Sequence, residues 1–252
     1  MKRRHISISM LVALALVAIP LTAQTPDFGA ILATLDERTT FGDGDFSAVY
    51  TIISETPGEE REVTQARLFR RDQNDQFLIL ILQPEVQRGQ GYLQIDDNVW
   101  FYDPESRKFE RTTIRENIQG SDAQNADLDE NTYSEDYEVV DWELGRLGNF
   151  DVYVMDLQAT NSDVAYERIK LWVRQDDPIV LKQEDYSVSG RLMRTSRFPR
   201  YQQVEDKLLP KQILINDELN QGERTQITMS DATTQQIPDS VFTKRYLERV
   251  SN

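Results

Sequence analysis

The stretch FLILILQP, residues 77–84, decides how this chain folds. It places six apolar residues in a row in a chain that is only 39% hydrophobic and has a formal net charge of -15. A strand in a half-solvated sheet alternates apolar and polar residues, because successive side chains point to opposite faces. Here both faces are apolar. We expect one face to meet helices or neighbouring structure and the other to line a space for a ligand, and the sequence leaves open which is which. The competing account is a central strand that is simply buried under a helix.

On both sides of this stretch the apolar residues keep a period of two, which is typical of strands. The connections between these segments are short and rich in Pro, Gly, Asn and Asp, so neighbouring strands should pair as antiparallel hairpins. We therefore predict a mainly β (α+β) fold with a single large antiparallel sheet that curls to protect its edges. The expected strands are residues 46–55, 63–71, 77–83, 91–96, 99–103, 108–114, 139–147, 150–160, 166–175, 178–187, 191–201, 209–217 and 223–232.

Two segments near the ends of the chain have helical character. Apolar residues recur at the spacing of one helix face at Phe28, Ile31, Leu32 and Leu35, with Asp27 as a cap. Residues 240–250 follow a strand-breaking proline and are predicted to be helical as well.

The segment from Gly120 to Glu138 interrupts the strand pattern and carries seven acids without a base. Asp127 and Asp129 suggest a calcium loop, but the glycine and the distal glutamate of such a loop are missing at the required spacing. We therefore expect an acidic, solvated loop that carries a short helix.

The first 23 residues are organised like a secretory signal peptide. A basic start is followed by an apolar run over residues 10–19, then by a proline and the small-residue end LTA. The apolar run is shorter than the roughly 20 residues that span a bilayer, which disfavours a membrane anchor. We expect cleavage after Ala23, export as a soluble protein, and one domain over residues 24–252.

The composition excludes several classes of enzyme. The chain has no cysteine, and its one histidine, His5, lies in the predicted signal peptide, so Ser-His-Asp and Cys-His catalysis and common zinc sites are excluded. No phosphate-binding or dinucleotide-binding glycine motif is present, and we expect no metal and no cofactor. The acidic charge disfavours binding to nucleic acid.

Residues 88–122, RGQGYLQIDDNVWFYDPESRKFERTTIRENIQGSD, resemble the outer-membrane lipoprotein-sorting proteins of the LolA and LolB family. The shared features, in chain order, are Gly89 or Gly91 before a short strand, a W-x-Y-x-P pattern at Trp100, Tyr102 and Pro104, the basic residues Arg107, Lys108 and Arg111, and finally Gly120, Ser121 and Asp122.

The resemblance implies an incomplete β-barrel of about eleven strands, plugged by a few short helices, whose hydrophobic interior holds the acyl chains of lipoproteins. It also implies acylated lipoproteins as partners, together with an inner-membrane lipoprotein-releasing transporter and an outer-membrane acceptor. Because no lipid-anchored cysteine is present, the chain is similar to a shuttling monomeric carrier of the LolA kind. In this family a strand arginine holds the lid helices, and Arg67 and Arg70 are the candidates.

The expected lining of the acyl cavity follows from the strand pattern combined with the resemblance. A shift of one residue in register moves a side chain to the other face of the sheet, so the assignment depends on register. The expected lining residues are Tyr50, Ile52, Leu68, Ile79, Ile81, Leu93, Ile95, Trp100, Tyr102, Trp142 and Trp172.

Two other functions are compatible with the sequence. A sensor or interaction module of the same fold would recognise lipoproteins or lipids, and an additional partner-binding domain would favour it. A hydrolase that depends only on carboxylates is disfavoured because the other catalytic residue types are missing.

Overall fold

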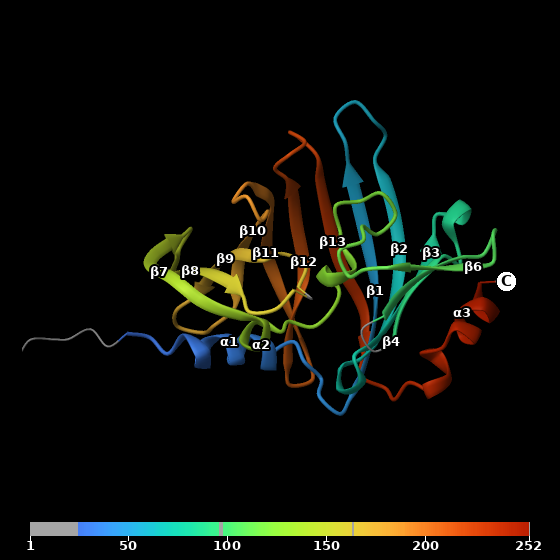
Figure 1. The fold of residues 1–252 in the computed structure, drawn as a ribbon, viewed down its shortest axis with the longest axis horizontal. Coiled ribbons are helices and arrows are strands. Elements are labelled where there is room, and N and C mark those ends of the chain that lie inside the picture. Colours follow the sequence, from blue (N-terminus) through green and yellow to red (C-terminus); the bar gives the residue numbers. More distant parts are fainter. Residues whose placement is uncertain (1–24, 96–97, 163, 252) are drawn as a thin grey trace, which may run out of the picture.

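The computed structural model describes residues 25–95, 98–162 and 164–251, so the predicted signal peptide lies outside the described residues. The mainly β prediction is confirmed: the described residues form one antiparallel sheet and three short helices (Figure 1). The strands are β1 (Asp45–Glu55), β2 (Glu62–Arg71), β3 (Gln76–Gln83), β4 (Gly91–Ile95), β5 (Asn98–Asp103), β6 (Lys108–Thr112), β7 (Tyr137–Leu147), β8 (Phe150–Ala159), β9 (Arg168–Arg174), β10 (Val180–Tyr186), β11 (Leu192–Val204), β12 (Lys207–Asp217) and β13 (Arg224–Thr233).

The helices are α1 (Phe28–Glu37), α2 (Tyr133–Asp136) and α3 (Lys244–Val250). Short 3-10 turns are η1 (Asp72–Asn74), η2 (Glu85–Gln87), η3 (Asn125–Asp127) and η4 (Asp239–Val241). Within the ranges that the structure describes, no helix has the length and apolar character to span a membrane.

The sheet has thirteen strands where the resemblance implied about eleven, and it is not closed. Its order is β6-β5-β4-β3-β2-β1-β13-β12-β11-β10-β9-β8-β7, so β6 and β7 are the two edges. Each half is a run of hairpins, as the short turns predict, and the halves join where β1 pairs with β13.

One connection must therefore cross the whole sheet, because β6 and β7 are consecutive in sequence but lie at opposite edges. This connection is residues 113–136, which we call the strap; in Figure 1 it is the green segment that runs from β6 across the sheet to α2. It contains η3 and α2, which confirms the expected short helix, but the expected solvation is wrong because Ser121, Asn125 and Leu128 are buried. We call the face of the sheet that the strap covers the inner face.

The two apolar faces of β3 each have a distinct neighbour. On the inner face Phe77, Ile79 and Ile81 belong to a core cluster together with Ile118 and Leu128 of the strap. On the outer face Leu78 belongs to a second cluster formed with Val241 of η4, Phe242 directly after it and Leu247 of α3. The expected C-terminal helix is thus confirmed, and it covers the outer face of β3.

Gly91 in β4 is required by this outer packing. A Cβ atom at Gly91 would lie 2.7 Å from the carbonyl oxygen of Ile79 and 2.9 Å from Cδ1 of Leu247. The glycine therefore allows α3 to approach the sheet closely.

Helix α1 covers the inner face at the other end of the sheet. Asp27 accepts a hydrogen bond from the backbone N–H of Ala30, which confirms the predicted cap. The buried side chains of Leu32 and Leu35 pack with residues of β8, β9 and β10. The helix and the strap together leave a space between themselves and the sheet.

Candidate binding cavity beneath the strap

A cavity of about 740 Å³ lies on the inner face between the sheet, the strap and α1. This volume falls within the roughly 300–1,000 Å³ of small-molecule sites. Part of its wall is apolar or aromatic and includes Leu35, Phe46, Tyr50, Val99, Ile169, Phe198 and Ile213. Another part is charged and includes Arg38, Arg70, Arg115 and Arg194, with Asp127, Asp129 and Glu130 from the strap. The cavity is therefore amphipathic in the state described.

Arg70 is the buried charge at the β2 end of the cavity, with only 3% of its surface exposed. Its Nε lies 2.6 Å from Oδ1 of Asp72, and its Nη2 donates a hydrogen bond of 2.6 Å to the carbonyl of Thr39. The guanidinium also lies over the rings of Phe41 and Phe46. Arg70 thus ties β2 to the connection between α1 and β1, whereas Arg67, the other candidate, is only half-buried.

Asp129 and Glu130 bring strap carboxylates close to this arginine. Oε2 of Glu130 accepts a hydrogen bond from Thr40, and Oδ1 of Asp129 accepts one from the backbone N–H of Glu130. Burial raises the pKa of Asp129 to about 6. Burial, followed by repulsion from Asp72, raises the pKa of Glu130 to about 7.

These two carboxyl groups should make the protein less stable as the pH rises. An acid whose pKa is higher in the folded chain holds its proton more tightly when folded, so its contribution favours folding at low pH and is lost as the pH rises through the folded pKa. Between pH 5 and pH 8 the free energy of unfolding should therefore fall, by at most about 1.4 kcal/mol per pH unit for each group. Urea unfolding at a series of pH values measures this slope.

The matched variant for this slope carries Asp129→Asn and Glu130→Gln, and the control carries Glu105→Gln at an exposed turn. The double variant should show a flatter profile between pH 5 and pH 8, and the control should keep the wild-type slope. Equal slopes in all three proteins would contradict the assignment.

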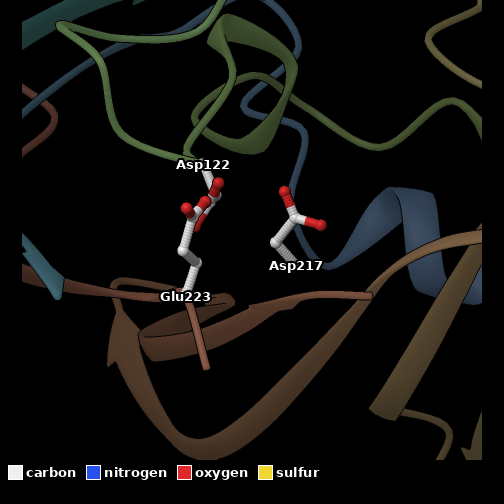
Figure 2. Close-up of side chains that lie close together, drawn as sticks. All are labelled: Asp122, Asp217 and Glu223. Atoms are coloured by element: carbon white, nitrogen blue, oxygen red, sulfur yellow. The ribbon is translucent and has the colours of Figure 1, made fainter. Parts of the chain in front are cut away.

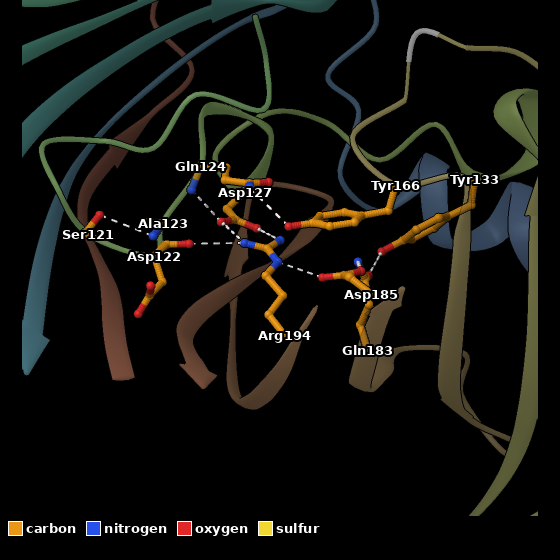
Figure 3. A network of polar contacts seen from close by, with 10 residues as sticks. All are labelled: Ser121, Asp122, Ala123, Gln124, Asp127, Tyr133, Tyr166, Gln183, Asp185 and Arg194. Atoms are coloured by element: carbon orange, nitrogen blue, oxygen red, sulfur yellow. Dashed lines mark hydrogen bonds and ion pairs between the residues drawn. The ribbon is translucent and has the colours of Figure 1, made fainter. Parts of the chain in front are cut away.

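Arg194 forms the second charged anchor, on β11 (Figure 3). Its Nε donates to Oδ2 of Asp185 on β10 at 2.7 Å, and its Nη1 donates to Oδ2 of Asp127 in the strap at 2.8 Å. Nη1 also lies 3.2 Å from the carbonyl oxygen of Asp122, and the guanidinium lies over the ring of Tyr166. One arginine of the sheet thus holds two parts of the strap.

The anchor is almost completely buried. Asp185 has no exposed surface and Arg194 has 7%. Burial disfavours the charge of Arg194, but Asp127 and Asp185 outweigh it and raise the pKa of the guanidinium. Burial raises the pKa of Asp185 although Arg194 opposes this change. Arg194 therefore stays charged, and the two carboxylates compete for it.

The network continues from this anchor into α2. Asp185 accepts a hydrogen bond from the side chain of Gln183, which accepts one from the hydroxyl group of Tyr133 at 2.8 Å (Figure 3). The backbone N–H groups of Tyr133 and Ser134 donate to the carboxylate of Asp36 in α1. The C-terminal end of the strap is thus fastened both to the sheet and to α1.

Three carboxylates gather where the strap meets the turn between β12 and β13: Asp122, Asp217 and Glu223 (Figure 2). Their oxygens lie within 4.8 Å of one another. Burial, together with repulsion from the other two, raises the pKa of Asp122. Asp122 accepts a hydrogen bond from Thr225, and Asp217 accepts two from turn backbone N–H groups. These hydrogen bonds account for the positions of the Asp122 and Asp217 carboxylates.

The sequence-predicted lining residues separate into three groups. Tyr50 lines the cavity. Ile52, Leu68, Ile79 and Ile81 lie on the same inner face, but they are covered in the core cluster that includes Ile118 and Leu128 of the strap. Contact of these residues with an acyl chain stays a prediction.

Trp142 is also on the inner face. Its ring centre lies 5.0 Å from that of Phe28, and it packs at the margin of the cluster beneath α1. The helix that precedes β1 therefore covers Trp142.

The other five side chains lie on the outer face, which corrects their expected orientation. Leu93, Ile95 and Tyr102 pack with the cluster beneath α3, and Lys244 lies 3.1 Å from the centre of the Trp100 ring. Trp172 pairs with Val154 and lies beneath Lys182, whose Nζ is 4.0 Å from the ring centre. The physical reason is register: Tyr92 and Leu171, one residue away, hold the inner positions.

The sequence did not reveal the Arg194 anchor. Asp185 lies in the polar run KQED, which contains no apolar residue. The sequence therefore does not show that one of these acids is buried. A signal was available for Asp127, which lies three residues after Gln124. This is the spacing of a reciprocal helix cap, and the two residues cap η3 in this way.

Solved structures of similar fold come from several bacteria. A LolA superfamily protein from Nitrosomonas europaea is 26% identical with a TM-score of 0.75, covering 86% of this chain and 97% of that one. A domain named as a candidate outer membrane lipoprotein-sorting protein from Vibrio parahaemolyticus is 23% identical with a TM-score of 0.76, covering 88% and 98%. A protein of a family of unknown function from Desulfovibrio piger is 19% identical with a TM-score of 0.75, covering 87% and 97%.

No match is found among curated proteins. A family model described as an uncharacterized protein matches residues 73–249, which is more than half of the chain. The chain therefore belongs to this family, and its fold is that of the LolA superfamily of outer-membrane lipoprotein-sorting proteins.

Proposed function

We propose that this protein is a periplasmic carrier that binds the acyl chains of lipoproteins on the inner face of its sheet and delivers them to the outer membrane. Its lipoprotein-sorting fold supports this proposal. The observation that carries it is the position of Ile118 and Leu128, which are strap side chains buried in the same core cluster as Ile79 and Ile81. The strap therefore occupies with its own apolar groups the place where acyl chains would lie.

The energetics of the task agree with this arrangement. Transfer of one methylene from water to an apolar site contributes about 0.8 kcal/mol, so a chain of about fourteen methylenes requires an extensive apolar surface. The walls of the closed cavity are partly charged, and a cluster of buried apolar side chains lies beneath the strap. Withdrawal of Ile118 and Leu128 would expose this surface for the acyl chain, and return of the strap would displace the chain on delivery.

A fluorescent fatty-acid probe tests the proposal on delipidated protein. Leu128→Ala removes a strap side chain from the apolar site, so it should raise probe affinity by about threefold or more while lowering stability, because the vacated volume becomes available to the ligand. The matched control is Leu93→Ala, which removes an equally buried leucine from the outer face.

The control should lower stability by a similar amount and leave probe affinity unchanged. Absence of probe uptake by the wild-type protein, or equal changes in affinity in the two variants, would contradict the proposed site. Mass spectrometry of lipids and lipoproteins that copurify with the protein from its native envelope then identifies the cargo.

A further inference from the structure

The strap is held by an arginine that already has a carboxylate partner on the sheet. Arg194 and Asp185 lie on adjacent strands, β11 and β10, and their 2.7 Å ion pair involves Nε, on the side of the guanidinium away from the strap carboxylate. Asp127 takes the other side, at Nη1 and Nη2. The anchor thus contains one positive and two negative side chains with little exposed surface.

This excess of carboxylate has a thermodynamic consequence. A buried arginine that loses its only partner is strongly destabilising, because an uncompensated charge remains. When Asp127 leaves with the strap, Arg194 keeps Asp185 and the sheet keeps a balanced pair. When Asp127 is in place, it is attracted to Arg194 and repelled by Asp185. At Arg194, Asp185 therefore lowers the free-energy cost of lifting the strap. Its separate contact to the strap through Gln183 and Tyr133 uses an oxygen that asparagine retains.

We propose that Asp185 is a positioning residue that makes the Arg194 anchor releasable: it pairs with Arg194 in the open state and weakens the hold on Asp127 in the closed state. This inference rests on the proposed function only in taking the strap as the gate of the cavity. It concerns the regulation of that gate. It predicts that Asp127→Asn and Asp185→Asn, two isosteric substitutions at the partners of Arg194, change the opening of the strap in opposite directions.

Hydrogen exchange of the full chain, followed by mass spectrometry without any lipid, tests the inference. Asp127→Asn weakens the strap's hold on Arg194 and leaves the Arg194–Asp185 pair balanced, so strap peptides should exchange faster by about tenfold. Asp185→Asn leaves Asp127 as the only charged partner, so strap peptides should exchange more slowly, by about threefold. Peptides from β3 serve as the internal reference for global unfolding.

The opposite signs separate a releasable anchor from a purely structural one. If Arg194 needed both carboxylates for stability, both variants would exchange faster in the strap, and that result would overturn the inference. In a background of Arg194→Gln and Asp185→Asn, which has no anchor charge on the sheet, Asp127→Asn should change strap exchange by less than about twofold. A larger change in that background would also overturn the inference. This comparison still tests the inference if the single variant Asp185→Asn does not fold.

The readout is independent of the proposed function. Strap exchange is measured without ligand, so the expected pattern can be obtained even if the fatty-acid probe does not bind. If the protein binds the probe but strap exchange is equal in Asp127→Asn and Asp185→Asn, the result would support the carrier function and reject the releasable anchor.

Discussion

Replacement of Arg194 by methionine should lower the free energy of unfolding by about 3–5 kcal/mol, because it leaves buried carboxylates without their cation. Asp185 has no exposed surface, and Asp127 is bound to the same guanidinium through two nitrogens. Methionine fills a similar volume but donates no hydrogen bond. Urea unfolding followed by the fluorescence of the three tryptophans measures the change.

Arg197→Met is the matched control, on the same strand at an exposed position. It should change stability by less than about 0.5 kcal/mol. Combining Arg194→Met with Asp185→Leu and Asp127→Asn should recover a large part of the loss, since no buried carboxylate is then left without its cation. A loss of under 1 kcal/mol for Arg194→Met, or a triple variant less stable than the single one, would show that the anchor is not a buried charge network.

A disulfide between the strap and β13 should weaken ligand uptake reversibly. Thr225 Oγ1 lies 3.1 Å from the backbone nitrogen of Asp122, which brings the two Cα atoms within about 7 Å, near the upper limit of disulfide geometry. The chain has no other cysteine, so Asp122→Cys with Thr225→Cys forms one defined crosslink. Oxidation should lower fatty-acid probe affinity at least about tenfold, or 1.4 kcal/mol.

Reduction of the same protein should restore uptake, which separates the crosslink from the effects of the substitutions. Each single cysteine variant should bind the probe equally well with or without oxidant. Undiminished uptake by the fully oxidised double variant would mean that the ligand enters without movement of the strap near Asp122.

The outline of the fold was predictable because the spacing of the apolar residues changes clearly, from that of a helix face near Phe28 to a period of two in the strands. Each hairpin of the sheet corresponds to a run of alternating residues separated by turn residues, and Asp27 marks the start of α1. The double apolar pattern of residues 77–82 predicted that both faces are covered. The face against helices is confirmed, but on the face expected to line a ligand space the strap packs instead.

The sequence did not predict in the same way which side chains of β4 and β5 point to the inner face of the sheet. Leu93 and Trp100 are as apolar as any inner residue, and the element that covers them, α3, comes about 150 residues later in the chain. A pattern of apolar residues states that a face is covered, but it does not state by what. The Arg194–Asp185 pair was hidden for a related reason: two charged residues on neighbouring strands become a site only when the register places them together.

The pairing of β1 with β13 also bears on how the molecule assembles. The first and last strands meet at the middle of the sheet, so contacts of the longest sequence separation hold its centre together. Such non-local contacts make folding slow, because a long segment of chain must be ordered before they form. During synthesis the hairpins of the first half can form early, but the edge of β1 must wait for the last strand. Until then that edge is open to pairing with another chain, and we expect aggregation during refolding to begin there.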